Sequence, residues 1–280
     1  MDIITNEKQI EVILFSCNRA SQAHTCLASF YDKFICLDPK VTVLWKATTD
    51  EFKKGYLKTQ KIFLGKKNLI WQEEEDFYSQ LTNTIQNSTA NFIMFLVDDD
   101  IFVNTVSIDD KQFEFLDKNQ SMIAVSLRLH KGVTHCYATN KNSSVPNFVK
   151  NIVWAWAGKE GDWGYPMSVD GNVYKTDIMK NIASVIRYKN PNTFESMLDA
   201  VSKQNGFPQY LCCYTEGPRL INIPVNIVQT QYNNRFTGEL STEQINTKYL
   251  SGQTIDYKSY SGIQATSVHV PVELKFIEEK

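Results

Sequence analysis

Three consecutive aspartates, Asp98, Asp99 and Asp100, follow directly after the apolar run 92–97, which is typical of a buried strand. Carboxylates this close repel one another unless a cation or hydrogen-bond donors lie among them. A hard divalent ion, held by one or two carboxylates and by substrate phosphate oxygens, satisfies that need. Such an ion would neutralise the charge that develops on a diphosphate leaving group. The alternative is a solvated acidic loop, and the position after an all-apolar strand favours the functional interpretation.

Other chemistry-bearing patterns are missing from the sequence. It contains neither a P-loop nor a Gly-x-Gly-x-x-Gly pattern, which disfavours P-loop nucleotide hydrolysis and dinucleotide redox chemistry. None of the four histidines is paired at metal-ligand spacing, which disfavours a histidine-based zinc hydrolase. The 29 basic and 31 acidic residues give a net charge of -2, so indiscriminate binding to nucleic acid or to an anionic membrane is not expected.

The chain reads as a folded protein of the cytosol. A hydrophobic fraction of 42% and a charged fraction of 21% are typical of globular proteins. The first residues lack the basic start and apolar stretch of a signal peptide, and no apolar run approaches the length of a transmembrane segment. The six cysteines include no Cys-x-x-Cys pair. We therefore predict a cytoplasmic protein without a transmembrane segment.

The elements that must position the acidic triplet alternate in the first half of the chain. Apolar runs at 10–15, 41–45, 68–71 and 92–97 predict strands, and amphipathic stretches between them predict helices. This alternation predicts an α/β fold with a mostly parallel central sheet flanked by helices. In such sheets ligands bind beyond the carboxyl ends of the strands, where the turn 16–19 and the acidic triplet both lie.

The second half of the chain is less regular. A fifth strand is expected at 122–129 and an irregular region at 130–170, followed by a helix at 195–203. Residues 241–244 form a plausible capping box that opens another helix, and 269–277 could close the chain as a strand. The sequence contains no repeat and no convincing linker. We predict a single domain, 1–280, in which 1–129 bind a nucleotide sugar and 130–280 bind an acceptor.

Five segments in this order resemble GT-A-type glycosyltransferases of the family 2 kind: residues 12–19, 75–77, 98–100, 168–174 and 190–195. The acidic triplet, similar to the family's DxD motif, is the most specific of them. The resemblance implies a single GT-A, Rossmann-like domain. It also implies metal-dependent transfer of a sugar from a nucleoside diphosphate sugar to a hydroxyl of a glycan or glycoconjugate, with inversion, in polysaccharide biosynthesis.

The resemblance also implies roles for residues around the donor. The turn after the first strand would cradle the base and ribose through Ser16, Asn18 and Arg19. Asp98 or Asp99 would lie near ribose and sugar hydroxyls. Asp100, with Asp98, would coordinate Mn²⁺ or Mg²⁺ on the diphosphate.

Glu195 is the implied general base, and Asp170 is the second candidate for base or a ligand of a sugar hydroxyl. An acceptor hydroxyl is a poor nucleophile at neutral pH, so a positioned carboxylate must take its proton as the bond forms. The family usually has an acidic pair before this helix, and this chain has the single carboxylate of Glu195. The alternatives are an ordinary carboxylate near a helix start for Glu195 and a turn residue before Gly171 for Asp170.

One histidine and one aromatic loop complete the candidates. His269 could fold back to the metal as a late ligand, or it could be a structural residue of its strand. Trp154, Trp156, Trp163 and Tyr165 crowd a glycine-rich loop and could stack on a sugar acceptor. The alternative is that these buried aromatic rings only anchor the loop.

Two other functions remain open at this point. A metal-dependent nucleotidyltransferase also uses carboxylates at strand ends, but the glycine- and basic-rich triphosphate loop expected of that class is missing. A non-catalytic carbohydrate-binding protein on the same scaffold would bind sugars without turnover.

Overall fold

The computed structural model describes residues 8–204, 206–226 and 240–279. Its centre is an eight-stranded sheet that combines strands from both parts of the chain. In spatial order the strands are β11 (Val153–Ala155), β13 (Tyr210–Cys212), β8 (Met122–Ser126), β12 (Asn172–Lys175), β5 (Phe92–Val97), β1 (Ile10–Cys17), β3 (Lys40–Lys46) and β4 (Leu69–Glu73). The predicted α/β class is confirmed.

The direction of each strand decides which residues lie together at the carboxyl edge of the central sheet. β5, β1, β3 and β4 run parallel to one another, and β13 is parallel to β8. β12 runs antiparallel between β5 and β8. An antiparallel strand begins at the edge where its neighbours end, so the residues ahead of β12 lie beside those that follow β5.

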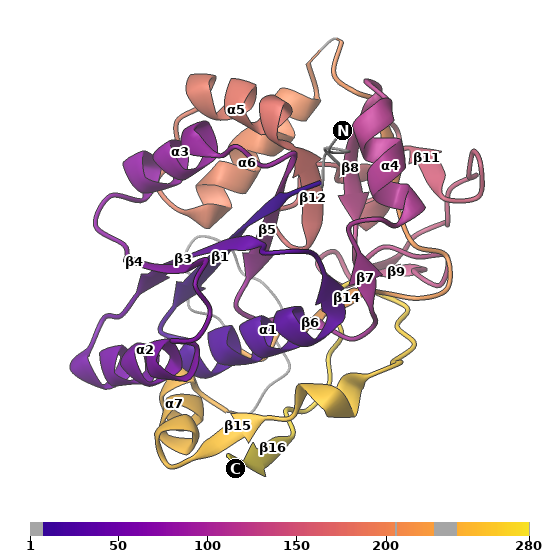
Figure 1. Ribbon diagram of the computed structural model, residues 1–280. Coiled ribbons are helices and arrows are strands. Elements are labelled where there is room, and N and C mark those ends of the chain that lie inside the picture. Colours follow the sequence, from indigo (N-terminus) through magenta and orange to yellow (C-terminus); the bar gives the residue numbers. More distant parts are fainter. Residues whose placement is uncertain (1–7, 205, 227–239, 280) are drawn as a thin grey trace, which may run out of the picture.

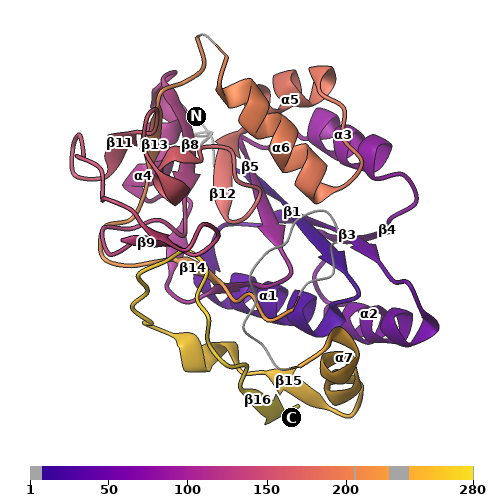
Figure 2. The same cartoon turned by 180° about the vertical axis from the view of Figure 1, so that it is seen from behind.

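Helices cover both faces of the sheet. They are α1 (Ala20–Lys33), α2 (Asp50–Ile62), α3 (Phe77–Asn87), α4 (Lys111–Lys118), α5 (Thr176–Val185), α6 (Pro191–Ser202) and α7 (Thr242–Leu250). Figures 1 and 2 show α3, α5 and α6 on one side of the central strands and α1 and α2 on the other. Alternate residues of β1 supply the two cores: Val12 and Leu14 face α1, and Ile13 and Phe15 face α3.

Local sequence sets where several helices begin. Thr49 caps α2 and Asp76 caps α3. In each case a side-chain oxygen accepts a hydrogen bond from a backbone amide in the first turn of the helix. Asn190 caps α6, whose first residue is Pro191. The predicted capping box at 241–244 is confirmed, with Ser241 as the cap of α7.

Short strand pairs surround the main sheet. They are β6 (Asp100–Phe102) with β14 (Leu220–Asn222), β15 (Gln253–Ile255) with β16 (Phe276–Glu278), β2 (Phe34–Ile35) with β7 (Val106–Ser107), and β9 (His135–Cys136) with β10 (Lys141–Asn142). Single 3-10 turns lie at Gly161–Gly164 and Tyr257–Tyr260. The predicted closing strand at 269–277 is wrong for most of its length. His269 makes one bridge to Asn222, and the strand itself is β16.

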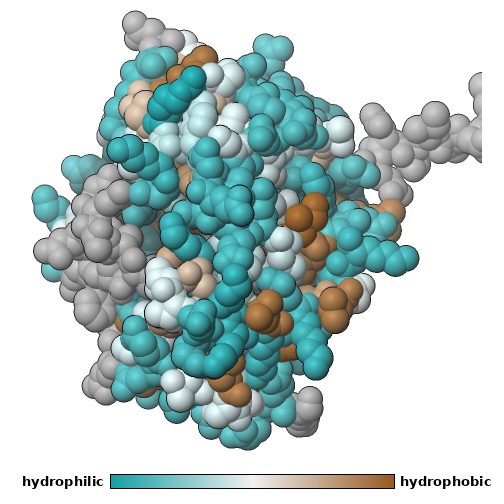
Figure 3. All heavy atoms as spheres, turned by 90° about the vertical axis from the view of Figure 1, so that its left-hand side faces the viewer, coloured by the Kyte–Doolittle hydropathy of each residue, from teal (hydrophilic) through white to brown (hydrophobic). Residues whose placement is uncertain are grey.

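One face of the molecule is mostly hydrophilic. The face that carries α2, α3 and β4 is largely covered by polar and charged side chains, with separate hydrophobic ones among them (Figure 3). Across the described ranges, no helix combines the length and the apolar character needed to cross a membrane.

Candidate functional site

Three segments meet at the carboxyl edge of the central sheet. The acidic triplet follows β5, and Asp170 lies just ahead of β12. The amide of Gly171 donates a 3.0 Å hydrogen bond to the carbonyl of Phe95, which holds these two segments side by side. Glu195 reaches the same segment from α6, where it accepts a hydrogen bond from the amide of Val169. The antiparallel direction of β12 therefore brings the second carboxylate segment to the first.

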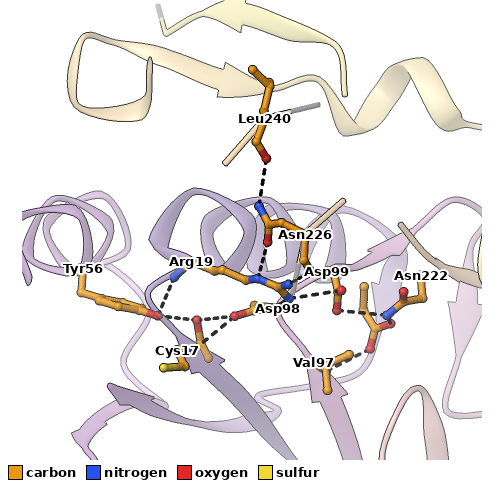
Figure 4. A network of polar contacts seen from close by, with 11 residues as sticks. Cys17, Arg19, Tyr56, Val97, Asp98, Asp99, Asn222, Asn226 and Leu240 are labelled. Atoms are coloured by element: carbon orange, nitrogen blue, oxygen red, sulfur yellow. Dashed lines mark hydrogen bonds and ion pairs between the residues drawn. The ribbon is translucent and has the colours of Figure 1, made fainter. Parts of the chain in front are cut away.

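Asp98 is held by the turn that follows β1. Its Oδ2 accepts hydrogen bonds from the Ser16 hydroxyl at 2.9 Å and from the Cys17 amide at 3.3 Å. Its Oδ1 lies 3.0 Å from Nη1 of Arg19 (Figure 4). Burial raises the pKa of Asp98 to about 6, although Arg19 acts in the opposite direction. Protein donors thus engage both carboxylate oxygens of Asp98.

Arg19 is a buried cation that joins distant parts of the chain. Besides Asp98 it contacts Asp99, with Nη1 3.3 Å from Oδ2. Its Nε donates to the side-chain oxygen of Asn226 at 2.9 Å, and Nη2 donates to the Asn226 carbonyl. The hydroxyl of Tyr56 on α2 accepts the amide of Arg19 and lies 2.6 Å from the Ser16 hydroxyl. Burial alone would lower the pKa of Arg19, but the carboxylates of Asp98 and Asp99 outweigh it.

Asn222, at the end of β14, bridges the other two aspartates. Its Nδ2 donates to Oδ1 of Asp99 at 3.0 Å and to Oδ1 of Asp100 at 3.4 Å. Oδ2 of Asp100 accepts the Val97 amide at 3.0 Å. Burial, and then the nearby Asp170 carboxylate, raises the pKa of Asp100 well above its usual range. Asp100 and Asp170 therefore form an acidic pair inside the protein.

Arg128, which follows β8, links Asp170 to Glu195. Its Nη1 lies 2.5 Å from Oδ2 of Asp170, and its Nη2 donates to the Ser168 hydroxyl at 2.9 Å. That hydroxyl donates to Oε1 of Glu195 at 3.0 Å, and the Val169 amide donates to the same oxygen at 3.0 Å. Burial raises the pKa of Glu195. The candidate base is thus held in one orientation by its neighbours on the segment ahead of β12.

His269 completes the group. Its Nε2 lies 3.5 Å from Oδ2 of Asp170. Burial lowers the pKa of His269, which favours the neutral imidazole. Two buried atoms here, Nδ1 of His269 and Oδ1 of Asp170, have no hydrogen-bond partner within the described residues. Unsatisfied buried polar atoms at a cluster of carboxylates are unused bonding capacity that a further polar or cationic partner would satisfy.

The donor set fits a hard divalent ion. Carboxylate oxygens suit Mg²⁺ and Mn²⁺, and imidazole is an acceptable ligand for transition metals. In the part of the chain that the structure describes, no three His, Cys, Asp or Glu side chains are arranged to hold a metal. Mg²⁺ commonly takes only one or two carboxylates and completes its shell with substrate phosphates and water. The pair Asp100 and Asp170, with the free Oδ1 of Asp170, meets that lower requirement.

One small cavity lies against the acidic triplet. A cavity of about 10 Å³ touches Asp98 and Asp99 and is otherwise lined mainly by apolar side chains, including Ile223 and Val225. That volume holds at most one water molecule. A larger open groove of about 300 Å³ lies elsewhere, between α3 and the strands β3 and β4.

The predicted donor residues divide into two groups. Ser16, Arg19, Asp98 and Asp99 form the single network described above. Asn18 lies apart from the carboxylates in a left-handed conformation, with φ of 58°. Its side chain donates to the Thr48 hydroxyl at 2.9 Å and accepts the Thr48 amide at 2.8 Å, which ties the turn to the loop after β3.

The predicted acceptor platform is contradicted for its three tryptophans. Trp154, Trp156 and Trp163 are buried in the core on the α3 side of the sheet. Their indole nitrogens donate to the carbonyls of Trp163, Pro208 and Val133 respectively. Rings packed in this way cannot stack on a sugar, so the anchoring alternative is correct for them. Tyr165 is only partly buried, and burial and then Glu195 raise its pKa, which places it beside the candidate base.

Sequence reasoning missed Arg128, Tyr56 and Asn222 as parts of this site. Arg128 had a usable signal, since a lone charge in the otherwise apolar run 122–129 must find a buried partner. Tyr56 shares the buried face of α2 with Phe52 and Thr59, and nothing local distinguishes its hydroxyl. Asn222 reaches the triplet only through the pairing of β14 with β6.

Comparisons with known proteins give similarity of structure alone. No protein-family model matches the chain, and no curated protein matches its sequence. Residues 1–349 of S. aureus TarS superpose with a TM-score of 0.46 at 14% identity, over 76% of this chain and 59% of that one. The complex of the same TarS fragment with UDP-GlcNAc gives 0.44 at 14%, over 75% and 60%.

A third similar structure is the mannosyltransferase PcManGT from Pyrobaculum calidifontis in complex with GDP-Man and Mn²⁺. Its TM-score is 0.40 at 13% identity, over 77% of this chain and 59% of that one. The matched part thus covers about three fifths of the TarS 1–349 fragment and of PcManGT, and 36% of the longer TarS chain. The identities and TM-scores are too low to transfer a site or a function to this chain.

Proposed function

We propose that this chain is a metal-dependent glycosyltransferase that moves a sugar from a nucleoside diphosphate sugar to a hydroxyl of a glycan or glycoconjugate. One observation carries the proposal. Asp100, Asp170 and Glu195 come from three separate segments and meet at the carboxyl edge of an α/β sheet, with Arg128 and Ser168 linking the last two. Carboxylates with a purely structural role are not expected to cluster there, because like charges in a buried site destabilise the fold.

Glu195 is assigned as the general base for direct displacement with inversion. Its raised pKa brings it closer to neutral pH, where a base is most effective. The Ser168 hydroxyl and the Val169 amide fix Oε1, so the carboxylate is oriented before an acceptor arrives. Tyr165, beside Glu195, is the one predicted acceptor residue that this proposal retains.

Asp100 and Asp170 would hold Mn²⁺ or Mg²⁺, with His269 beside them, and the ion would neutralise the diphosphate leaving group. Asp98 is assigned to Arg19 rather than to the ion, because its Oδ1 is ion-paired and its Oδ2 accepts two hydrogen bonds. Asp100, by contrast, accepts hydrogen bonds only from neutral donors, and Oδ1 of Asp170 has no hydrogen-bond partner among the described residues.

Apart from Asn18, which is bonded to Thr48, the proposed donor residues belong to the network around Asp98. Arg19 keeps a positive charge at the edge where a diphosphate would lie. Ser16, Asn18 and Asp99 are assigned to the base, ribose and sugar hydroxyls, as donors and acceptors on that edge.

The test is a binding panel followed by product analysis. Thermal-shift or calorimetric titration with UDP, GDP, ADP and CDP, each with and without Mn²⁺, should show one nucleotide whose binding needs the metal. Asp100→Asn should abolish the metal dependence. The exposed Asp109 provides a matched control, and Asp109→Asn should leave it unchanged.

Product identity then separates the candidate functions. Release of a nucleoside diphosphate from the sugar donor supports transfer. Release of pyrophosphate from a nucleoside triphosphate would indicate a nucleotidyltransferase, and sugar binding without turnover would indicate a carbohydrate-binding protein. A flat response across all nucleotides would overturn the proposal.

A further inference from the structure

A basic segment crosses α2 and continues past its end. Between Phe52 and Lys67 the chain has six lysines and no acidic residue, although the whole chain carries a net charge of -2. The buried side of this helix is formed by Phe52, Tyr56 and Thr59. The lysines therefore lie on or near its outer side, and those that are not paired with carboxylates give this surface a local positive charge.

Exposed aliphatic side chains lie among these lysines. Leu64 is 78% exposed and Leu57 is 52% exposed, and Ile62 lies between them in the sequence. The segment after α1 adds Leu37 at 66% and Ile35 at 58%. Figure 3 views the face that carries α2 and shows hydrophobic side chains set among hydrophilic ones. We call this surface the α2 patch, and it comprises Ile35, Leu37, Leu57, Lys61, Ile62, Leu64, Lys66 and Lys67.

Contacts place the two segments of the α2 patch side by side. The rings of Tyr31 and Phe63 have centroids 6.0 Å apart, and Nζ of Lys66 lies 4.2 Å from the Tyr31 ring. The Asn68 side chain donates to the carbonyl of Asp38 at 3.4 Å. The residues around Leu37 and Leu64 therefore belong to one continuous surface.

The patch keeps cationic groups free for a partner. Lys53, Lys54 and Lys58 pair with Glu73, Glu51 and Glu279 respectively. Lys61 and Lys67 have no ion-pair partner among residues 8–204, 206–226 and 240–279, and both are exposed. Holding like charges together without counterions is unfavourable, and an anionic surface would relieve it.

We propose that the α2 patch docks this protein onto an anionic lipid bilayer. Lysines near a bilayer that contains acidic lipids contribute about 1 kcal/mol each, and exposed Leu and Ile side chains can enter the interface between them. The composition disfavours other partners. Protein interfaces are enriched in Arg and aromatic residues and depleted in Lys, surfaces that bind single-stranded nucleic acid rely on aromatic stacking, and contacts to duplex phosphates make no use of exposed Leu and Ile. The exposed apolar residues of the patch are all Leu or Ile.

The test is co-sedimentation of the full chain with vesicles of phosphatidylcholine, with and without phosphatidylglycerol. Wild type should bind only the anionic vesicles and should be released by salt. Lys61→Gln and Lys67→Gln should each lower the partition coefficient about fivefold. Leu37→Ser combined with Leu64→Ser should lower it at constant charge.

Matched controls come from other surfaces. Lys141→Gln with Lys189→Gln removes two exposed lysines elsewhere, and Val149→Ser with Val185→Ser removes exposed aliphatic groups. Both controls should bind as wild type does. Absence of binding to anionic vesicles, or equal losses in the control variants, overturns the proposal. So does a dimer in solution that Leu37→Ser with Leu64→Ser dissociates, because a second copy would then cover the patch. Thermal unfolding of every variant verifies that these surface changes leave the fold intact.

Discussion

Arg128 and Asp170 form a buried ion pair in which Nη1 lies 2.5 Å from Oδ2, with side-chain exposures of 7% and 11%. The second terminal nitrogen of the guanidinium group, Nη2, donates to the Ser168 hydroxyl, which in turn donates to Glu195. One cation therefore positions two carboxylates of the candidate site. Removing only one partner of a buried ion pair strongly lowers the free energy of unfolding, because the remaining charge has no solvent to stabilise it.

Arg128→Met should lower the free energy of unfolding by about 3–5 kcal/mol, since it leaves Asp170 charged and unpaired. Urea denaturation followed by circular dichroism measures this change. Lys203→Met is the control, because Lys203 pairs with Asp199 on the exposed surface of α6. Its expected cost is below about 1 kcal/mol. Equal costs for the two variants would mean that the Arg128 pair has no special role.

Gly171 allows Arg128 to approach the segment ahead of β12. Its φ is 71°, and a Cβ at this position would lie 2.9 Å from Cδ2 of Leu220 and 3.3 Å from Cγ of Arg128. Gly262 has a nearly identical φ of 72° but no atom within 4 Å of such a Cβ. The two positions therefore separate backbone strain from crowding.

Gly262→Ala should cost about 1–2 kcal/mol, the penalty of a left-handed alanine. Gly171→Ala should cost about 1–3 kcal/mol more, because Leu220 and Arg128 must move. Parallel chemical denaturation of the two variants measures the difference. If both variants lose the same stability, the Gly171 contacts with Arg128 and Leu220 can yield at no cost.

The regular first half of the fold could be predicted because its central strands consist mostly of apolar residues. β1, β3 and β5 are buried on both faces, so hydrophobicity alone marks them. β12 could not be found in this way, since only Val173 and Tyr174 of its four residues are apolar. Its place in the sheet depends on pairing with strands far away in the sequence. That pairing sets the direction of the segment that carries Asp170.

The site was predictable in location and less so in its contacts. The acidic triplet follows a buried strand, so its position at the sheet edge follows from the sequence. Which aspartate contacts Arg19 depends on the backbone conformation of two irregular turns, and a sequence pattern does not predict that conformation. The burial of the tryptophans could not be predicted either, because an aromatic cluster in a glycine-rich loop can face the solvent or the core. Here the indoles of Trp154 and Trp163 each donate to a buried carbonyl, which fixes them inside.

Glu195→Gln should reduce sugar transfer by about 10²- to 10⁴-fold while leaving nucleotide affinity unchanged, because the amide cannot accept the acceptor's proton. The amide oxygen can still accept from Ser168 and Val169, so the local structure should persist. Single-turnover rates and binding titrations on the same preparation separate the two effects. Glu243→Gln, on the exposed start of α7, is the control and should transfer at the wild-type rate.

The wild-type rate should also fall as the pH drops through the raised pKa of Glu195, because the base must be deprotonated. A variant that retains full transfer, or a rate independent of pH on the acidic side, would exclude Glu195 as the base.

His24 on α1 gives a pH dependence of stability that does not involve the candidate site. Its Nδ1 lies 3.0 Å from the Tyr249 hydroxyl, and its ring packs edge-on against Phe63. Burial lowers the pKa of His24 to about 4, with Glu279 opposing and Lys58 adding to the decrease. In the unfolded chain the imidazole titrates near 6.5. Between these two values the unfolded state binds a proton that the native state does not.

The stability that His24 contributes is therefore complete above about pH 6.5 and is lost as the pH falls toward about 4. The shift to about 4 corresponds to a loss of at most about 3 kcal/mol. His24→Asn keeps a polar atom near Nδ1 and removes the titration. Other groups titrate in the same range, so the quantity to measure is the difference in unfolding free energy between wild type and His24→Asn. As the pH falls from neutral to about 5, wild type should lose stability relative to His24→Asn. A constant difference would show that His24 titrates normally in the native protein.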